Sequence, residues 1–68
     1  MSQPLPRIAF LGIGLMGAPM TRNLLDAGYP MTLWNRTRSK ADAFAPEAMV
    51  AESPAEAVRD ADLVITML

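Results

Sequence analysis

The sequence predicts a domain of the α/β class, with a parallel sheet built in the order β-α-β-α-β-α-β. Two observations support this class. Short apolar runs rich in strand-forming residues recur along the 68 residues, and segments with helical spacing of apolar residues separate them. Strands that alternate with helices pair in parallel through right-handed crossovers. A chain of this length forms at most one small domain, which buries about 60% of the surface that it exposes when unfolded.

The first strand and the first helix are predicted on either side of a glycine-rich turn. The continuous apolar run Arg7–Leu11 is typical of a strand that is buried on both faces. A helix is predicted over about Leu15–Ala27, with Pro19 near its first turn, where a missing N–H is tolerated. Gly28 stands at the position of a left-handed C-terminal cap. The apolar face of this helix repeats every three or four residues and comprises Gly17, Met20, Leu24 and Ala27.

The next strand, helix and strand continue the alternation. Met31–Trp34 predicts the second strand, and Thr37 is the expected N-cap of a second helix that Pro46 ends. Ala48–Ala51 predicts a short third strand. The apolar stripe of the second helix comprises Ala41, Phe44 and Ala45.

A third helix and a fourth strand complete the predicted order. Ser53–Glu56 reads Ser-Pro-Ala-Glu, a capping box with proline at the first helical position. Leu63–Leu68 is an apolar run that predicts the last strand. An apolar strand that is left uncovered at the edge of a sheet pairs readily with another chain. We therefore expect these residues to be a fragment of a longer protein, or to form a homo-oligomer through that edge.

Composition excludes several classes of function. The net charge of −1 argues against nucleic acid as a partner. The chain has no signal architecture and no apolar run of about 18 residues, so we expect a cytoplasmic protein with no membrane contact. Cysteine and histidine are both absent, which excludes disulfide, thiolate and zinc-thiolate chemistry, and we expect no metal site. Lys40 is the one lysine, so groups for acid–base chemistry are scarce.

The glycine-rich turn has the spacing GxGxxG, between a buried strand and a helix N-terminus. In such a turn Gly12 allows the sharp bend, Gly14 leaves room for a pyrophosphate, and Gly17 lets the helix pack closely on the strand. The first N–H groups of the helix attract phosphate, because they lack internal partners and the helix dipole is positive there. Glycine-rich turns also occur for purely conformational reasons, so the motif alone leaves that alternative open. The predicted cofactor-binding residues of this turn are Gly12, Ile13, Gly14, Leu15, Met16 and Gly17.

The end of the second strand indicates which dinucleotide binds. Folds that use NAD place Asp or Glu about 20 residues beyond the glycines, to hold the ribose 2′-hydroxyl. Here Asn35 stands 23 positions after Gly12, and no carboxylate occupies that place. Arg36, the helix start at Thr37, and Lys40 suit a 2′-phosphate instead. The predicted cofactor-binding residues of this segment are Asn35, Arg36, Thr37 and Lys40. The sequence therefore predicts NADP as the cofactor rather than NAD, and Asn35→Asp is expected to shift the preference towards NAD.

Alternatives to the NADP site follow from the same residues. The missing carboxylate also weakens FAD and S-adenosylmethionine, whose ribose hydroxyls are commonly held by an acid at this place. The cations Arg36, Arg38 and Lys40 also fit the solvated start of a helix. Cations at a helix N-terminus are mildly unfavourable without an anion, which favours the NADP hypothesis. The methionines are interpreted as packing residues rather than a ligand-binding cluster.

The motifs together resemble the β-hydroxyacid dehydrogenases, a family that includes 3-hydroxyisobutyrate dehydrogenase, tartronate semialdehyde reductase, and glyoxylate or succinic semialdehyde reductases. Phe10–Leu24 matches the N-terminal signature of that family nearly throughout. The departures are mild: Ile13 stands for Leu, and Thr21 stands for Ser or Ala. Other segments that resemble the family, in the expected order, are Asn35–Thr37, Ser53–Glu56 and Val64–Leu68.

The resemblance implies a Rossmann-type dinucleotide-binding domain, of which residues 1–68 are the N-terminal part. It implies hydride transfer between NADP(H) and a small β-hydroxyacid or semialdehyde. The family's catalytic lysine lies in a later segment, next to an all-helical substrate domain, and neither is expected in these residues. Lys40 does not replace that lysine, because it stands at the 2′-phosphate end of the cofactor. Met67 and Leu68 are expected near the nicotinamide-side ribose.

Two other functions share these motifs. Imine reductases have the same glycine turn and the same Asn-Arg-Thr, while Met16 and the ending Thr66–Leu68 favour the hydroxyacid enzymes. A non-catalytic NADP-binding module is the alternative from another class. A continuation of about 200 residues that includes a lysine-bearing helix would favour an enzyme over this module.

Overall fold

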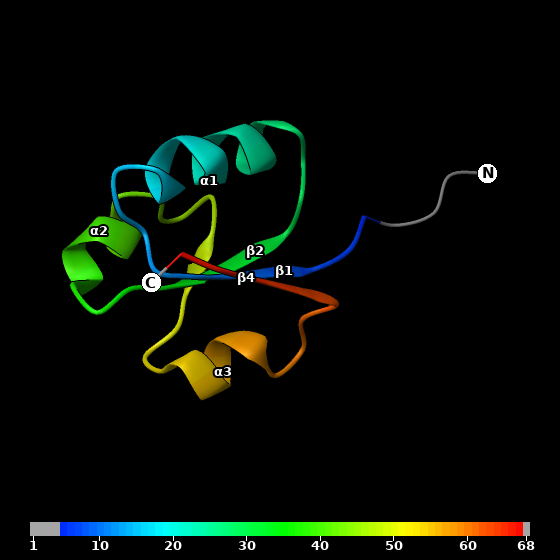
Figure 1. Cartoon of the computed structure of the whole chain (residues 1–68). Coiled ribbons are helices and arrows are strands. Elements are labelled where there is room, and N and C mark those ends of the chain that lie inside the picture. The colour runs from blue at the N-terminus through cyan, green and yellow to red at the C-terminus, as the bar shows by residue number, and fades with distance from the viewer. Residues whose placement is uncertain (1–4, 68) are drawn as a thin grey trace.

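The structure, a computed structural model, describes residues 5–67 and contains a four-stranded parallel sheet with the strand order β3-β2-β1-β4 (Figure 1). The strands are β1 (Ile8–Leu11), β2 (Met31–Trp34), β3 (Met49–Val50) and β4 (Leu63–Thr66). The helices are α1 (Gly17–Asp26), α2 (Arg38–Asp42) and α3 (Pro54–Val58). Helices α1 and α2 cover one face of the sheet, and α3 covers the other. The predicted α/β class, parallel sheet and order of elements are confirmed.

Strand β1 lies in the middle of the sheet and sets the register of its neighbours. Ile8 pairs with Met31 of β2 on one side and with Leu63 of β4 on the other. All four residues of β1 are buried, as the continuous apolar run predicts. Strand β4 is an edge strand, and its Leu63 and Val64 are 48% and 45% exposed.

The two faces of the sheet differ in the size of the side chains that they bury. The face under α1 and α2 carries the larger cluster, centred on Phe10 and Leu33, which are fully buried. The face under α3 carries small side chains, Ala9, Ala51 and Ala57, together with Leu11. Small residues allow α3 to lie close to the sheet, while the larger ones supply most of the apolar burial that stabilises the fold.

Helix α1 differs from its prediction in its start and in its buried face. It begins at Gly17, because Leu15 and Met16 belong to the preceding turn. Its fully buried side chain is Thr21, while Met20 is 38% exposed and Ala27 is also exposed. The predicted face is therefore confirmed at Gly17, which is buried, and at Leu24, which packs against the core, but it is wrong at Met20 and Ala27. Spacings of three and four fit both Met20 and Thr21, and apolarity alone selected the methionine.

The C-terminal end of α1 is closed as predicted. Gly28 has φ +94°, a left-handed conformation that favours glycine. Its N–H donates to the Leu25 carbonyl at 2.9 Å, and the Tyr29 N–H donates to the Leu24 carbonyl at 3.1 Å. These two bonds form a Schellman motif, which directs the chain back towards β2.

Helix α2 is shorter than predicted. Thr37 is its N-cap, as expected, but the Thr37 side chain forms no capping hydrogen bond. The helix ends at Asp42, before Pro46, and residues 43–47 form turns. Ala41 and Phe44 of the predicted stripe are buried, whereas Ala45 is exposed.

The remaining elements differ from their predictions mainly in length. Strands β1 and β3 are shorter than the predicted Arg7–Leu11 and Ala48–Ala51, and β4 ends at Thr66. The Ser53 hydroxyl accepts the Glu56 N–H at 3.1 Å, which confirms the predicted cap of α3. The Glu56 carboxylate accepts the N–H of Glu52 at 3.4 Å, so the second bond of the capping box involves the residue before the N-cap.

Candidate functional site

The turn after β1 contains two glycines that the fold itself requires. Gly12 has φ +90°, and its N–H donates to the Trp34 carbonyl at 2.8 Å. A Cβ on Gly17 would lie 3.0 Å from the Gly12 carbonyl oxygen and 3.1 Å from Cε1 of Phe10. The fold therefore requires glycine at both positions: Gly12 for its left-handed backbone conformation, and Gly17 for the close approach of α1 to β1.

Gly14 is different, because nothing in the described protein requires a glycine there. It is exposed, its φ is not positive, and an added Cβ would meet no heavy atom within 4 Å. The space beside it is a hollow of about 550 Å³, which we call the turn hollow. Its lining residues are Gly14, Leu15, Met16, Gly17, Thr66 and Met67. A ligand can therefore approach the main chain of Gly14 from the side on which other residues carry a Cβ.

The turn hollow is also where main-chain donors are free. Within residues 5–67, no carbonyl oxygen accepts the N–H groups of Gly14, Leu15 or Met16. The Ala18 N–H donates to the Gly14 carbonyl at 3.1 Å, and α1 continues from there for ten residues without an acidic residue in its first turn. Free N–H groups at the positive end of a helix dipole form a binding site for an anion.

Large apolar side chains stand at the same turn without joining the core. Leu15 is 96% exposed and Met16 is 71% exposed. The interpretation of the methionines as packing residues is correct for Met31, which is buried, and wrong for Met16 and Met49, each 71% exposed. Because no core covers Leu15 and Met16, their side chains can contact a ligand that occupies the turn hollow.

Asn35 links the glycine-rich turn to the segment that follows β2. Its side-chain Oδ1 accepts the Ile13 N–H at 2.6 Å, and its Nδ2 donates to the Thr37 carbonyl at 2.9 Å. The Ile13 side chain is 3% exposed and belongs to the core. The structure thus brings together two segments that the sequence assigned to one site.

The cations after β2 fall into two groups. Arg38 pairs with Asp42 at 3.4 Å and with Glu52 at 3.8 Å. Arg36 and Lys40 are exposed, and neither forms an ion pair within the described part of the chain. They are therefore available to an anionic ligand. Helix α2 has only five residues, so its dipole adds little to their attraction.

The end of β4 supplies the other wall of the turn hollow. The Met67 N–H donates to the Leu11 carbonyl at 2.8 Å, which continues the pairing of β4 with β1. Thr66 also lines the turn hollow, although it was not among the predicted cofactor-binding residues. The sequence could have indicated Thr66 as a site residue, because Thr66 ends an apolar strand and ligands of α/β sheets bind at the carboxyl ends of strands. Leu68, the remaining predicted residue, lies outside the described residues.

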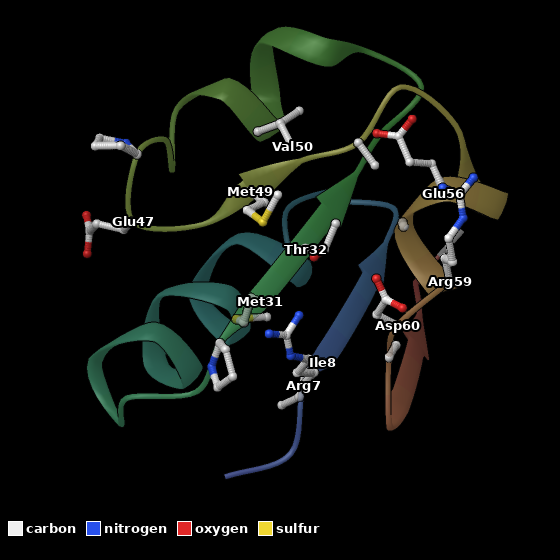
Figure 2. Close-up of a pocket in the computed structure, with 15 residues that line it drawn as sticks. Arg7, Ile8, Met31, Thr32, Glu47, Met49, Val50, Glu56, Arg59 and Asp60 are labelled. Atoms are coloured by element: carbon white, nitrogen blue, oxygen red, sulfur yellow. The ribbon is translucent and has the colours of Figure 1, made fainter. Parts of the chain in front are cut away.

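A second hollow, of about 360 Å³, lies beside α3 and is lined by residues of β1, β2 and β3. Figure 2 shows Arg7 and Ile8 at the amino end of β1, and the same hollow reaches past Thr32 of β2 to Val50 of β3 and Glu56 of α3. It shares no lining residue with the turn hollow, so it is not part of the candidate site. Among residues 5–67 there is also no cluster of side chains that could hold a metal ion.

An ion pair outside the candidate site joins α1 to the segment before β3. Arg22 Nη1 lies 2.7 Å from Glu47 Oε2, and the guanidinium stands 5.4 Å from the centre of the Phe44 ring. The hydrogen bond between them raises the pKa of Arg22 and lowers the pKa of Glu47. This pair contributes to the packing of α1 rather than to ligand binding.

Comparison with known families identifies the turn and its surroundings. Residues 7–68 match a family model described as the NAD binding domain of 6-phosphogluconate dehydrogenase. The chain belongs to this family. Its glycine turn and four parallel strands are therefore those of an NAD(P)-binding domain, and the predicted resemblance to hydroxyacid dehydrogenases is confirmed by the relatives below.

The NAD-binding domain has relatives among several reductases and dehydrogenases. Glyoxylate/succinic semialdehyde reductase 1 of Arabidopsis thaliana is 47% identical over 62 residues, which cover 90% of this chain and 22% of the relative. The structure of Mycobacterium tuberculosis 3-hydroxyisobutyrate dehydrogenase is 45% identical, with a TM-score of 0.85 over 94% of this chain and 22% of that one. An imine reductase from Aspergillus terreus, solved with NADPH4, is 30% identical, with a TM-score of 0.83 over 97% and 24% of the two chains.

The chain spans about a fifth of the length of these relatives, since the two enzymes named first are covered to 22%. The relatives are oxidoreductases, so this NAD-binding domain resembles the domains of enzymes. In the described residues, no helix has both the length and the apolar character needed to cross a membrane.

Proposed function

We propose that this chain binds NADP(H), as the N-terminal part of the dinucleotide-binding domain of an oxidoreductase. Gly14 is the observation that carries the proposal. A Cβ at this position would touch no protein atom, and the hollow beside it is lined by Gly14, Leu15 and Met16, whose N–H groups have no main-chain acceptor among residues 5–67. A pyrophosphate in the turn hollow would accept hydrogen bonds from the main chain at Leu15 and Met16, and it would need the space that a side chain at Gly14 would fill.

The preference for NADP over NAD rests on the segment after β2. Arg36 and Lys40 carry positive charge without an ion-pair partner among residues 5–67, which suits a 2′-phosphate. Asn35 stands where NAD-binding folds carry a carboxylate. The similar imine reductase was solved with NADPH4, which supports the same choice. Thr37 belongs to this half of the proposed site by its position between the two cations.

The proposed reaction is hydride transfer between NADP(H) and a small β-hydroxyacid or semialdehyde. This reaction is supported by the similarity of the chain to 3-hydroxyisobutyrate dehydrogenase and to a glyoxylate/succinic semialdehyde reductase. Imine reduction is the second candidate, since an imine reductase has a similar fold. Steady-state rates with succinic semialdehyde and with a cyclic imine distinguish the two candidates. The cytoplasmic location and the homo-oligomer stay predictions.

The groups that assist hydride transfer would come from residues outside this segment. Lys40 lies on α2, after β2, whereas Thr66 of the turn hollow ends β4 and Met67 follows it. Strand β1 separates β2 from β4 in the sheet, so the lysine and the turn hollow belong to different halves of the proposed site. A separate helical substrate domain, as in the hydroxyacid dehydrogenases, completes the proposal.

Calorimetric titration of the intact protein with NADPH and with NADH tests the cofactor. We expect tighter binding of NADPH. Arg36→Ala should weaken NADPH by about 10- to 100-fold and leave NADH nearly unchanged, because a charge-assisted bond to the 2′-phosphate contributes about 1.5–3 kcal/mol. Arg38→Ala is the matched control, since Arg38 already pairs with Asp42 and Glu52. Equal losses for both cofactors in Arg36→Ala would contradict the 2′-phosphate assignment.

A further inference from the structure

Asn35 occupies a place where the main chain alone leaves a donor without a partner. The ladder between β1 and β2 runs to the pair Leu11 and Trp34, and one more bond follows, from the Gly12 N–H to the Trp34 carbonyl. Beyond that bond the two strands diverge: β1 continues into the glycine-rich turn, and β2 continues into the segment before α2. The next donor of the turn, the Ile13 N–H, bonds to the Asn35 side chain at 2.6 Å instead of to a strand.

The second bond of Asn35 holds the segment that carries the cations. Its Nδ2 donates at 2.9 Å to the Thr37 carbonyl, and that carbonyl also accepts the Lys40 N–H at 3.1 Å in the first turn of α2. Arg36 lies between Asn35 and Thr37 in the chain. The Asn35 carboxamide therefore fixes both ends of the residue proposed to bind the 2′-phosphate, and the start of the helix that carries Lys40.

We infer that Asn35 is a positioning residue that holds the pyrophosphate turn and the Arg36–Lys40 segment in one arrangement for binding. This inference rests on the proposed function. Ile13 immediately precedes Gly14. The Ile13 side chain is buried in the core, and its N–H donates a hydrogen bond to Asn35, so both groups hold the turn in place. Both polar atoms of Asn35 have protein partners, so the residue acts through Ile13 and Thr37 rather than as a substitute for the ribose-binding acid.

The inference changes the expectation for an acidic residue at this place. Aspartate keeps an oxygen for the Ile13 N–H, but it lacks the N–H that the Thr37 carbonyl accepts. Two acceptors would then face each other where a hydrogen bond of 2.9 Å stands now. Asn35→Asp should therefore bind NADH no more tightly than the natural protein does, in contrast to the shift towards NAD that the sequence analysis predicts.

The test compares Asn35→Ala, Asn35→Asp and Arg36→Ala in the intact protein. Calorimetry with NADPH and NADH measures cofactor binding. Amide hydrogen exchange of Ile13, followed by NMR without ligand, reports on the hydrogen bond from the Ile13 N–H to Asn35. Asn35→Ala should weaken both cofactors by a similar factor, about tenfold for two lost hydrogen bonds, and should speed the exchange of the Ile13 amide. Arg36→Ala should weaken NADPH alone and leave the Ile13 exchange unchanged. Asn35→Asp should restore the slow exchange of Ile13.

The outcomes separate this inference from the proposed function. Natural protein that binds neither cofactor would overturn the proposed function and the inference together. Normal binding by the natural protein, with unchanged affinities in Asn35→Ala, would overturn the inference alone. So would an Asn35→Asp variant that binds NADH more tightly than the natural protein, because that gain requires direct contact with the ribose. Should Asn35→Ala fail to fold, Asn35→Asp alone still decides, through its NADH affinity and its Ile13 exchange.

Discussion

The Cβ that Gly17 lacks would lie 3.0 Å from the carbonyl oxygen of Gly12. This close approach joins the first residue of α1 to the turn after β1, and it sets how closely the helix packs on the sheet. Gly14 lies between these two glycines and has no such neighbour. Two glycines of the motif thus serve the fold, and the third borders open space that no neighbouring protein atom fills.

Gly17→Ala is expected to destabilise the fold. The new Cβ would press on the Gly12 carbonyl and on the Phe10 ring, which is itself fully buried and unable to move aside freely. Overpacking of this kind costs about 1–3 kcal/mol of unfolding free energy. Urea denaturation of the intact protein, followed by circular dichroism, measures the effect. An unchanged midpoint would show that α1 shifts to accommodate the methyl group.

Gly14→Ala is the matched variant, and it is expected to weaken cofactor binding without destabilising the fold. Its methyl group meets no protein atom and its φ is not positive, so stability should stay equal or rise by up to about 1 kcal/mol. The affinity for NADPH should fall at least about tenfold, because the methyl group fills the space proposed for the pyrophosphate. The same urea titration and a calorimetric titration check both statements. Unaltered affinity in this variant would argue that the cofactor does not approach Gly14.

The sequence predicted the local features of this fold well, because each depends on residues a few positions apart. Gly28 ends α1 and Ser53 caps α3 for reasons that lie within one helical turn. The predicted buried face of α1 was wrong at Met20, since local spacing fits Met20 as well as Thr21 and only the packed sheet distinguishes them. The bond between Asn35 and Ile13 spans 22 positions and depends on the register of β1 and β2, which no local pattern contains.

Thr21→Val is expected to stabilise the protein. The Thr21 side chain is fully buried in α1, and its hydroxyl has no hydrogen-bond partner among the described residues. Valine has nearly the same shape and removes the unsatisfied group, which costs about 1–3 kcal/mol when buried. We expect a rise of about 1 kcal/mol in unfolding free energy, measured by urea denaturation. Thr21→Ser is the control, because it keeps the hydroxyl and removes a methyl group, so it should lower stability.

Glu47→Gln should reduce the loss of stability in acid. The hydrogen bond from Arg22 lowers the pKa of Glu47 in the folded protein below its ordinary value of 4.5. The ion pair therefore stabilises the fold fully above pH 4.5, and this contribution is lost as the pH falls through the lower, folded pKa. Both side chains are exposed, so the effect is small. Urea midpoints at pH 7 and pH 3 test it, and equal pH dependence in the variant and the natural protein would contradict it.

The position of β1 between β2 and β4 has a consequence for the order in which the site forms. Ile8 pairs with Met31 nearby in sequence and with Leu63 far along it. Contacts that close short loops form sooner than those that close long ones, and a nascent chain folds from its N-terminus. We expect the glycine turn and Asn35 to come together before β4 joins the sheet, because the pairing of β1 with β2 closes the shorter loop. The adenosine half of the proposed site would then form before its nicotinamide half.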